Sequence, residues 1–441
     1  METQMKEEVK FSQSITLKAI VVAFITMLML IPQTMMQGLI RERQNRSFET
    51  IEKINAKWSN EQTLIGPVLS IPVVIENMDS DKKTVRAHHL LHITPDVLNT
   101  EVKLFPEPRH FGIYKTILYK SQINISGTFV KPENLNFEKG DVSWEEAYIS
   151  IGISDLRGIT SNVTIDINNK EYVFEVGDNA KNRFLDKALT ADVKKLFDIE
   201  DGKTLDFNIK LNLNGSKSII FVPIGKTSVV DISGGWGAPG FIGNFCPEYE
   251  IENESFAAKW SIMRFNRNIP EAWFDNNISS FDDSEFGVDL VDTVDHYQQN
   301  MRSAKYALMF IALTFVVFFF VEIMIGKRIH PIQYTLVAIA LTLFYSLLLS
   351  ISERLGFGIA YAIASVATIG LIVAYTYSIF KNAVYTVVLG TILAGLYVFL
   401  YVILQLEDVA LMIGSIGLFV ILAIIMFLSR RINWYKDEKI S

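Results

Sequence analysis

The sequence has a single cysteine, Cys246, among 441 residues. One cysteine excludes any disulfide within the chain, so each folded part must be stabilised by its own packed core. Cys246 lies far from the apolar segment near the N-terminus, so the pattern of a lipoprotein signal is missing. That segment is followed by Pro32-Gln33-Thr34-Met35-Met36 and not by a small-x-small cleavage site, which indicates an uncleaved membrane anchor.

The chain also lacks an excess of basic residues. Its 41 lysines and arginines are outnumbered by 48 aspartates and glutamates, which gives a net charge of −7 and a pI near 5.5. Proteins that bind nucleic acids normally present a basic face to the phosphates. We therefore expect no nucleic-acid partner.

Common catalytic motifs are missing as well. There is no His-Glu-x-x-His, no Gly-x-Ser-x-Gly, and no Ser-x-x-Lys placed before a strand-like core. Three of the six histidines, His88, His89 and His92, lie close together, but no close Asp, Glu or Cys completes a metal site. We interpret them as surface residues of a strand. The sequence predicts neither an enzyme nor a metal or cofactor site.

Charge is absent above all from long apolar stretches. A helix needs about 20 apolar residues to cross the hydrocarbon core of a bilayer. The stretches of sufficient length are 19–36, 306–325, 332–351, 355–380, 383–404 and 409–429. The last four contain no Asp, Glu, Lys or Arg. They predict a polytopic membrane protein with six spanning helices, for which membrane lipids are the first partners.

The charges of the loops between these stretches predict an orientation. Lysine and arginine collect in cytoplasmic loops. The loop at 326–331, the loop at Lys381 and the C-terminal tail are basic, whereas the loops at 352–354 and 405–408 are neutral and acidic. Both termini are therefore predicted to be cytoplasmic, and residues 38–303 to be extracytoplasmic. The three arginines between residues 41 and 46 oppose this orientation locally, but long domains translocate largely regardless of charge.

Residues 38–303 have the pattern of a β-rich domain. Apolar residues alternate or are β-branched in runs such as 119–129 and 207–213, and turn residues such as Asn168-Asn169 separate the runs. The stretch 180–196 is predicted to form one or two short helices. The length suits one large domain or two tightly joined lobes.

Together these patterns predict a polytopic α-helical membrane protein with a large β-rich extracytoplasmic domain inserted after the first transmembrane helix. The expected organisation is a cytoplasmic tail with the first transmembrane helix (1–37), the β-rich domain (38–303), a bundle of five transmembrane helices (304–429) and a cytoplasmic tail (430–441).

Few charged residues stand out as functional candidates. In Ser154-Asp155-Leu156-Arg157-Gly158, the acid and the base could form a recognition loop. The preferred interpretation is that Asp155 caps a turn and Arg157 pairs with a neighbouring carboxylate. Ionisable residues at the membrane boundaries are further candidates, because such groups are costly near lipid. They are Glu322, His330 and Glu353.

Two glycine-containing patterns are interpreted as packing features. The segment 234–245 is rich in glycine and aromatic residues but does not match a phosphate-binding loop, so its aromatic side chains are expected to pack inward. Small residues recur at every fourth position in the stretch 355–380, which predicts a seam for close helix packing. These residues are Gly356, Ala360, Ala364 and Thr368.

Several short motifs along the chain resemble those of the CreD family of bacterial inner-membrane proteins. They are Ile65-Gly66-Pro67 with Ile71-Pro72, Gly112-Ile113-Tyr114, Asp155-Leu156-Arg157-Gly158, Phe241-Ile242-Gly243, Lys305-Tyr306-Ala307, His330-Pro331-Ile332-Gln333-Tyr334, Phe344-Tyr345 with Leu347-Leu348-Leu349, Ser352-Glu353 and Trp434-Tyr435. The resemblance implies a role in cell-envelope integrity, with links to colicin tolerance, to envelope stress and to a two-component regulon. It brings no catalytic residues to this chain.

Three hypotheses follow. The first is a non-enzymatic envelope protein whose β-rich domain binds another envelope protein or a cell-wall component, while the helical bundle anchors it. The second is a transporter or a lipid-handling protein, with the small-residue seam lining a path. The third is an enzyme acting on envelope glycans.

Overall fold

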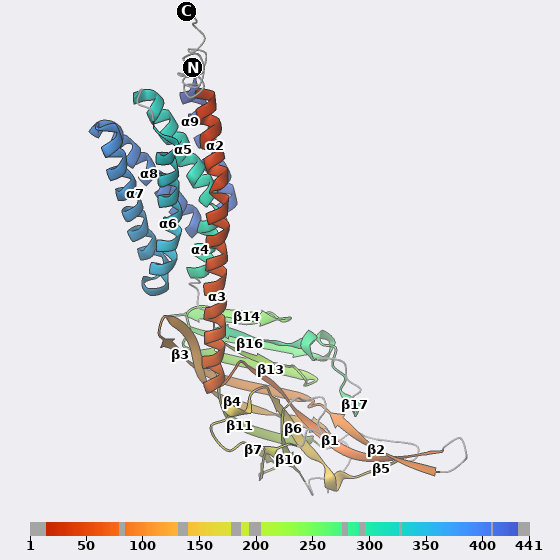
Figure 1. The fold of residues 1–441 in the computed structure, drawn as a ribbon. Helices are drawn as coiled ribbons and strands as arrows, with labels where there is room; N and C mark the ends of the chain where they lie inside the picture. The colour runs from red at the N-terminus through yellow and green to blue at the C-terminus, as the bar shows by residue number, and fades with distance from the viewer. Residues whose placement is uncertain are drawn as a thin grey trace, which may run out of the picture. The chain divides into compact units, whose positions relative to one another are not determined.

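The structure, a computed structural model, describes residues 15–78, 84–130, 140–177, 187–193, 204–275, 281–290, 296–325, 329–406 and 409–430. The chain forms two compact units (Figure 1). The first, here called the helical unit, consists of Met1–Ser47 and Val294–Ser441, and the second, the β unit, is Phe48–Thr293. Each unit is described by itself.

The described part of the helical unit is built from α-helices. They are α2 (Ile15–Leu28), the first part of α3 (Leu30–Trp58), α4 (His296–Lys305), α5 (Ala307–Ile325), α6 (Pro331–Leu355), α7 (Phe357–Phe380), α8 (Ala383–Gln405) and α9 (Ala410–Ser429). Each predicted apolar stretch coincides with one or two of these helices, apart from single residues between or before them, such as Met29 and Gly356. A helix satisfies its own backbone hydrogen bonds, which is what an apolar segment in lipid requires.

Four of the described helical segments are long and apolar enough to cross a membrane. They are Lys18–Trp58, Pro331–Leu355, Phe357–Phe380 and Ala383–Gln405. The pair α4 and α5, bent by 46° at the break between them, would be a fifth, and Met412–Phe427 within α9 is a shorter apolar helix. The prediction of a polytopic helical membrane protein with an inserted β-rich domain is confirmed at this level.

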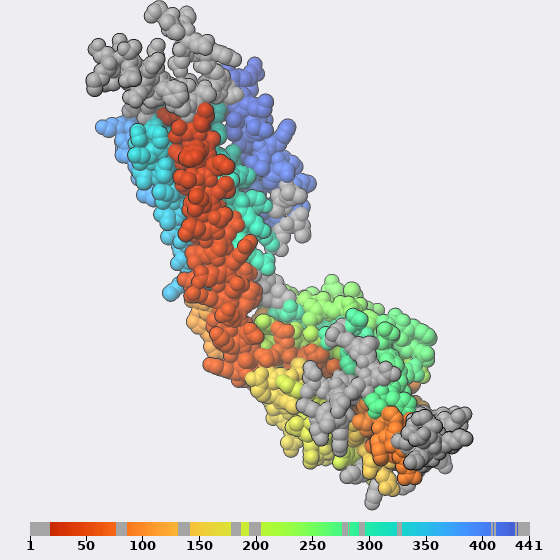
Figure 2. Space-filling view, turned by 45° about the vertical axis from the view of Figure 1, so that its right-hand side comes forward, coloured from red at the N-terminus to blue at the C-terminus, as the bar shows by residue number. Residues whose placement is uncertain are grey.

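Apolar side chains both fill and cover the helical unit. The predicted seam on α7 lies inside, because Ala360, Ala364 and Thr368 are buried. On the face shown in Figure 2 the red N-terminal helix is exposed along its length. Its exposed side chains include Phe24 and Met35, which suits a surface that lipid covers.

The β unit contains two sheets. The ten-stranded sheet has the strand order β14-β18-β12-β1-β6-β10-β9, with β2, β5 and β17 at its side. Its strands are β1 (Gln62–Met78), β2 (Thr84–Ile93), β5 (Gly140–Val142), β6 (Tyr148–Ile153), β9 (Glu175–Val176), β10 (Ala188–Asp192), β12 (Ser218–Phe221), β14 (Pro239–Gly243), β17 (Ala272–Phe274) and β18 (Phe286–Leu290).

The eight-stranded sheet has the order β15-β16-β13-β3-β4-β11-β7-β8. Its strands are β3 (Val97–Phe111), β4 (Tyr114–Val130), β7 (Thr164–Ile167), β8 (Lys170–Val173), β11 (Thr204–Ser216), β13 (Thr227–Gly234), β15 (Glu248–Glu252) and β16 (Ser255–Met263). Apart from the parallel pairs β1/β12 and β3/β13, the described strand pairs are antiparallel.

One hydrophobic core joins the two sheets. Strands β11 and β16 alternate exposed and buried residues, whereas all six residues of β6 are buried. Alternation is expected of a strand with one face on the core and the other in solvent. Side chains of both sheets belong to one packed cluster, which includes Ile151 and Trp260. The β unit is therefore one domain and not two lobes.

The structure corrects the helix predicted at 180–196. Within the described residues of this range, Ala188–Asp192 is strand β10, paired with β6 on one side and β9 on the other. Leu189 and Ala191 are both buried, so this short segment follows the period of a strand. Pairing with a central strand overrides the helical propensity of its alanines and leucine.

The boundaries of the two units differ from the predicted 38 and 303. Residues 38–47 and 294–303 lie in the helical unit. Helix α3 continues without a break from its apolar start through a polar second half to Trp58. Hydropathy marks where the apolar sequence ends, and a helix that gains polar residues continues past that point.

Candidate functional site

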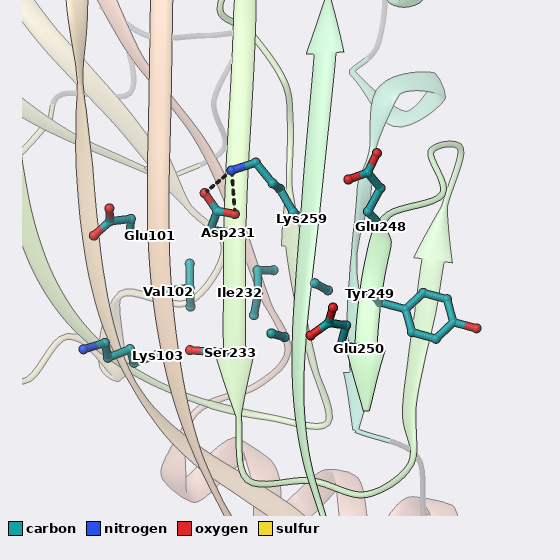
Figure 3. A pocket seen from close by; sticks show the side chains of 12 residues that line it. Glu101, Val102, Lys103, Asp231, Ile232, Ser233, Glu248, Tyr249, Glu250 and Lys259 are labelled. Carbon is teal, nitrogen blue, oxygen red and sulfur yellow. Dashed lines mark hydrogen bonds and ion pairs between the residues drawn. The ribbon is translucent and has the colours of Figure 1, made fainter. Parts of the chain in front are cut away.

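A groove of about 500 Å³ lies on the outward face of the eight-stranded sheet. It crosses the four neighbouring strands β15, β16, β13 and β3 (Figure 3). Outward residues line it, and they alternate along each strand with core residues such as Val102 and Ile232. A sheet of four neighbouring paired strands therefore forms the floor of this site.

The register of the strands explains why this face is hollow here. Ser233 stands opposite Ala257 on one side and Lys103 on the other. In the next row, Asp231 stands opposite Lys259 and Glu101. Directly opposed side chains in a sheet lie within contact distance. The small side chains of Ser233 and Ala257 thus leave a depression beside a row of long charged ones.

Negative charge dominates the groove. Its charged lining residues are Glu101, Asp231, Glu248, Glu250, Lys103 and Lys259. Lys259 donates to Asp231 at 3.2 Å, so one of the two lysines is already paired (Figure 3). Three glutamates then face one remaining lysine, and the groove suits a ligand that carries positive charge.

Sequence reasoning singled out none of these groove residues. The alternation in 255–263 was a usable signal, because it marks Ala257 and Lys259 as outward-facing. No comparable signal in the sequence indicates which strands lie next to each other. The parallel pairing of β13 with β3 brings together residues around 101–103 and 231–233, and no local sequence pattern indicates this pairing.

The Asp155–Arg157 pair lies elsewhere and is structural in its contacts. The Asp155 carboxylate is buried and accepts from the Arg157 backbone N–H at 3.2 Å and from Nε at 2.8 Å. It also accepts from the Asn60 backbone N–H at 3.0 Å. The guanidinium of Arg157 donates to the carbonyl oxygen of Ala56 near the end of α3 at 2.5 Å. Asp155 therefore caps its turn, and Arg157 pairs with Asp155 itself.

A buried glutamine, Gln62, completes this junction. Its Nε2 donates to the carbonyl oxygens of Asp155 and Asn214 at 3.0 and 2.9 Å. A side chain on Gly158 would collide with the Asn214 carbonyl and with Gln62. The Asp-Leu-Arg-Gly motif thus positions the end of α3 against the β unit, and glycine is required for the close approach.

The clustered histidines, His88, His89 and His92, differ in burial and in contacts. His92 is buried, makes a 2.8 Å hydrogen bond with Ser70 and packs on the Trp273 ring at a centroid distance of 5.3 Å. The interpretation of all three as surface residues is therefore wrong for His92. His89 faces the other way and pairs with Asp275 at 2.7 Å. No group of three His, Cys, Asp or Glu that could hold a metal occurs among the described residues.

Acidification is expected to destabilise the β unit through His92. Burial lowers the pKa of His92 to about 4, against an ordinary 6.5, although the nearby Asp275 charge opposes the shift. Because the folded state resists protonation, the contribution is present above pH 6.5 and lost toward pH 4. The free energy of unfolding should fall by about 2 kcal/mol between pH 6.5 and pH 5 from this group. Urea unfolding of wild type and His92→Asn across this range tests it: equal pH slopes would contradict the prediction.

The His330-Pro331-Ile332-Gln333-Tyr334 motif forms the start of α6. The His330 Nδ1 accepts from the Ile332 N–H, while the Gln333 side chain accepts from the His330 N–H at 2.9 Å. This reciprocal arrangement is a capping box, and Pro331 occupies the first helical position, where no N–H is needed. His330 therefore acts on the backbone of its own helix.

Tyr334 connects this motif to Glu322. The Tyr334 hydroxyl donates to Glu322 Oε2 at 2.9 Å, and the Ile329 N–H donates to Oε1 at 2.9 Å. Lys18 of α2 forms an ion pair with the same carboxylate. One buried carboxylate thus joins α2, α5 and α6.

Glu353 lies at the other end of α6. It accepts from the Tyr297 hydroxyl at 3.2 Å, beside a buried hydrogen bond from Asn300 to Ser352 of 2.8 Å. Tyr334 and Glu353 are about 28 Å apart along the helix axis at about 1.5 Å per residue. The candidates Glu322 and Glu353 therefore belong to separate clusters and form no common site.

The glycine-rich segment 234–245 packs as expected. Trp236, Phe241 and Phe245 are partly buried against the core of the β unit. The Phe241 ring contacts Trp260 edge-on at a centroid distance of 5.9 Å.

Comparison with known proteins shows similarity over nearly the full length of the chain. The sequence matches the family model described as inner membrane protein CreD over residues 14–435. The inner membrane protein CreD of Escherichia coli (strain K12) is 30% identical over 419 residues, which cover 93% of this chain and 91% of that protein. Among solved structures, an M1 zinc metallopeptidase from Deinococcus radiodurans aligns with 38% of each chain at 8% identity. Its TM-score of 0.17 is too low to support an inference about fold or activity.

Proposed function

Because this chain belongs to the CreD family of inner membrane proteins, we propose that it supports cell-envelope integrity and stress tolerance by binding an envelope component through its β unit. In this proposal the protein is not an enzyme. The helical unit anchors it, both termini are cytoplasmic, and the β unit faces the periplasm. The bound component is another envelope protein or a part of the cell wall.

The groove on the eight-stranded sheet carries this proposal. It combines a floor of paired strands with fixed charges of mostly one sign, which is suited to recognition of a complementary surface. By contrast, Asp155 and Arg157 are the sequence-predicted candidates in the β unit, and their polar groups bond to each other and to the neighbouring backbone. The alternating loop charges of the sequence support the periplasmic orientation of the groove.

Photo-crosslinking in living cells tests the proposal. A photoreactive amino acid at Lys103 places the probe in the groove, and one at Glu171 of β8 is the matched control on the opposite edge of the same sheet. We expect a discrete adduct with one envelope protein or a cell-wall fragment from position 103 only. The adduct should be lost when Glu250→Lys reverses a groove charge. Equal adduct patterns from both positions would contradict binding at the groove.

A specific observation favours a transporter or lipid-handling protein as the second candidate. Within the described residues, buried oxygens of Gln33, Asn300 and Ser303 have no hydrogen-bond partner. Gln33 and Asn300 otherwise bond across helices, to the Ala304 carbonyl at 2.7 Å and to Ser352. Buried acceptors without donors in a membrane helix bundle are suited to a polar ligand or a path for one.

The two candidate functions predict different accessibility of position 300 to a water-soluble reagent. In a Cys246→Ser background, cysteine introduced at Asn300 should react with a water-soluble maleimide if a hydrated path reaches it. Protection of this cysteine, together with a protein adduct in the groove, supports the binding function. Rapid labelling of this cysteine with only lipid adducts from position 103 supports the second candidate.

A further inference from the structure

Strand β15 ends the eight-stranded sheet. Within the described part of the chain it pairs with β16 alone, and all five of its residues are exposed. An edge strand leaves a row of backbone N–H and C=O groups free to pair with another strand. The side chains of β15 show which strand would fit.

The core side of the sheet continues onto β15 without being covered there. Tyr249 stands opposite Ala258, and Ile251 stands opposite Phe256. Ala258 and Phe256 are 4% and 3% exposed, but Tyr249 and Ile251 are 58% and 43% exposed. The Tyr249 ring also lies 4.7 Å from that of Phe241, which packs on the core. One more strand beside β15 would bury this apolar pair.

The turn after β15 determines which backbone groups point outward. Asn253 and Glu254 both have positive φ and join β15 to β16 as a two-residue hairpin turn. The closing pair, Glu252 and Ser255, is then hydrogen-bonded, and hydrogen-bonded pairs alternate along an antiparallel ladder. The backbone groups of Tyr249 and Ile251 therefore face the open edge.

The other face of β15 is acidic. Glu248, Glu250 and Glu252 are exposed and share the groove side of the sheet, where Lys259 is already paired with Asp231. Glutamates on an edge strand repel an acidic strand, because like charges repel, and they attract a basic one. The same repulsion disfavours pairing of β15 with β15 of a second copy.

We propose that β15 accepts an extended segment of a partner protein as an additional strand, in which basic and apolar residues alternate. The lysines or arginines face Glu248, Glu250 and Glu252, and the apolar residues cover Tyr249 and Ile251. This mode of binding gives affinity through the backbone and selectivity through alternate side chains. It rests on the proposed function, since it gives the partner of the groove a chemical class.

Fluorescence anisotropy with the full-length protein in a neutral detergent tests this inference. The probe is a labelled peptide that alternates lysine with valine. The comparison peptides are its glutamate–valine counterpart and the same lysine–valine peptide with alternate backbone nitrogens methylated. We expect the unmodified basic peptide to bind at least about tenfold more tightly than either. Equal binding of the methylated peptide would mean charge attraction without strand pairing and would overturn the proposal.

A proline variant tests the backbone of β15 directly. Ile251→Pro removes an N–H that points to the open edge and leaves the bonds between β15 and β16 in place. Glu171→Pro is the matched control, because β8 is the other edge strand and is likewise joined to its neighbour by a two-residue turn, Asn168-Asn169. Affinity should fall about tenfold in the first variant and stay unchanged in the second.

The outcomes separate this inference from the proposed function. Equal affinity in wild type and Ile251→Pro, with thermal unfolding of both variants alike, would overturn strand addition. If position 103 still crosslinks to an envelope component in that case, the proposed function stands and only the mode of binding is wrong. If the basic peptide binds β15 in vitro but no groove adduct forms in cells, the proposed function fails instead.

Discussion

Replacing Glu322 by alanine is expected to lower the free energy of unfolding of the helical unit by about 3–5 kcal/mol. Glu322 is 6% exposed, and its carboxylate accepts hydrogen bonds from the Tyr334 hydroxyl and the Ile329 N–H and pairs with the Lys18 ammonium. The alanine variant leaves these donors without an acceptor and the lysine without its counter-charge. Thermal unfolding of the purified protein in detergent measures the loss.

Two comparisons separate the ion pair from the hydrogen bonds. Glu322→Gln keeps an acceptor for Tyr334 but cannot neutralise Lys18. Its free energy of unfolding should therefore lie between those of wild type and the alanine variant. A double-mutant cycle with Lys18→Met should show strong non-additivity, because the two residues interact directly.

Glu353→Ala is the matched control for this prediction. Glu353 also carries a carboxylate that joins two helices, but it lies near the end of α6, is only partly buried and accepts a hydrogen bond from Tyr297. Its replacement should cost less than about 1.5 kcal/mol. Equal losses at Glu322 and Glu353 would show that the Lys18–Glu322–Tyr334 cluster does not stabilise the unit in the way inferred.

Replacing Asp155 by alanine is expected to destabilise the β unit by about 2–3 kcal/mol. Asp155 is 3% exposed, and its loss leaves the N–H of Asn60 without this acceptor and the Arg157 guanidinium without its carboxylate partner. Urea unfolding followed by tryptophan fluorescence measures the effect. Asp166→Ala, at an exposed carboxylate of β7, is the control and should stay within about 0.5 kcal/mol of wild type.

The same carboxylate predicts an acid-dependent loss of stability. Hydrogen bonds from Arg157 lower the pKa of Asp155 to about 2, from an ordinary 3.8, against the opposing effect of burial. A lowered pKa in the folded state means that the contribution is complete above pH 4 and is lost as the pH falls toward 2. Asp155→Asn should remove this part of the pH dependence. An unchanged acid profile in that variant would contradict the assignment.

Both predictions give the sequence-predicted candidates a structural role. Asp155, Arg157 and His330 hold turns and helix ends, and Glu322 and Glu353 join helices. In these short motifs, which carry the family resemblance, polar groups satisfy the backbone where the chain changes direction. The groove for which we propose binding is formed by other residues, on β3, β13, β15 and β16.

The sequence by itself predicted the membrane helices and the inserted β-rich domain. Hydropathy over about 20 residues is a local property, and a segment without charge has few alternatives to a helix in lipid. Alternation likewise identified strands such as Thr204–Ser216, because one face meets the core along the whole strand. It failed at 188–192, where pairing with β6 and β9 decided the outcome.

Only the tertiary structure decided which distant residues meet. Lys18 and Glu322 are 304 positions apart, and the sequence around neither residue indicates that they pair. The groove needs the parallel pairing of β3 with β13, and the exposed edge needs β15 to be last in its sheet. Such contacts depend on how separate strands and helices are ordered in space. That order follows from the packing of the whole core. No local pattern of residues indicates it.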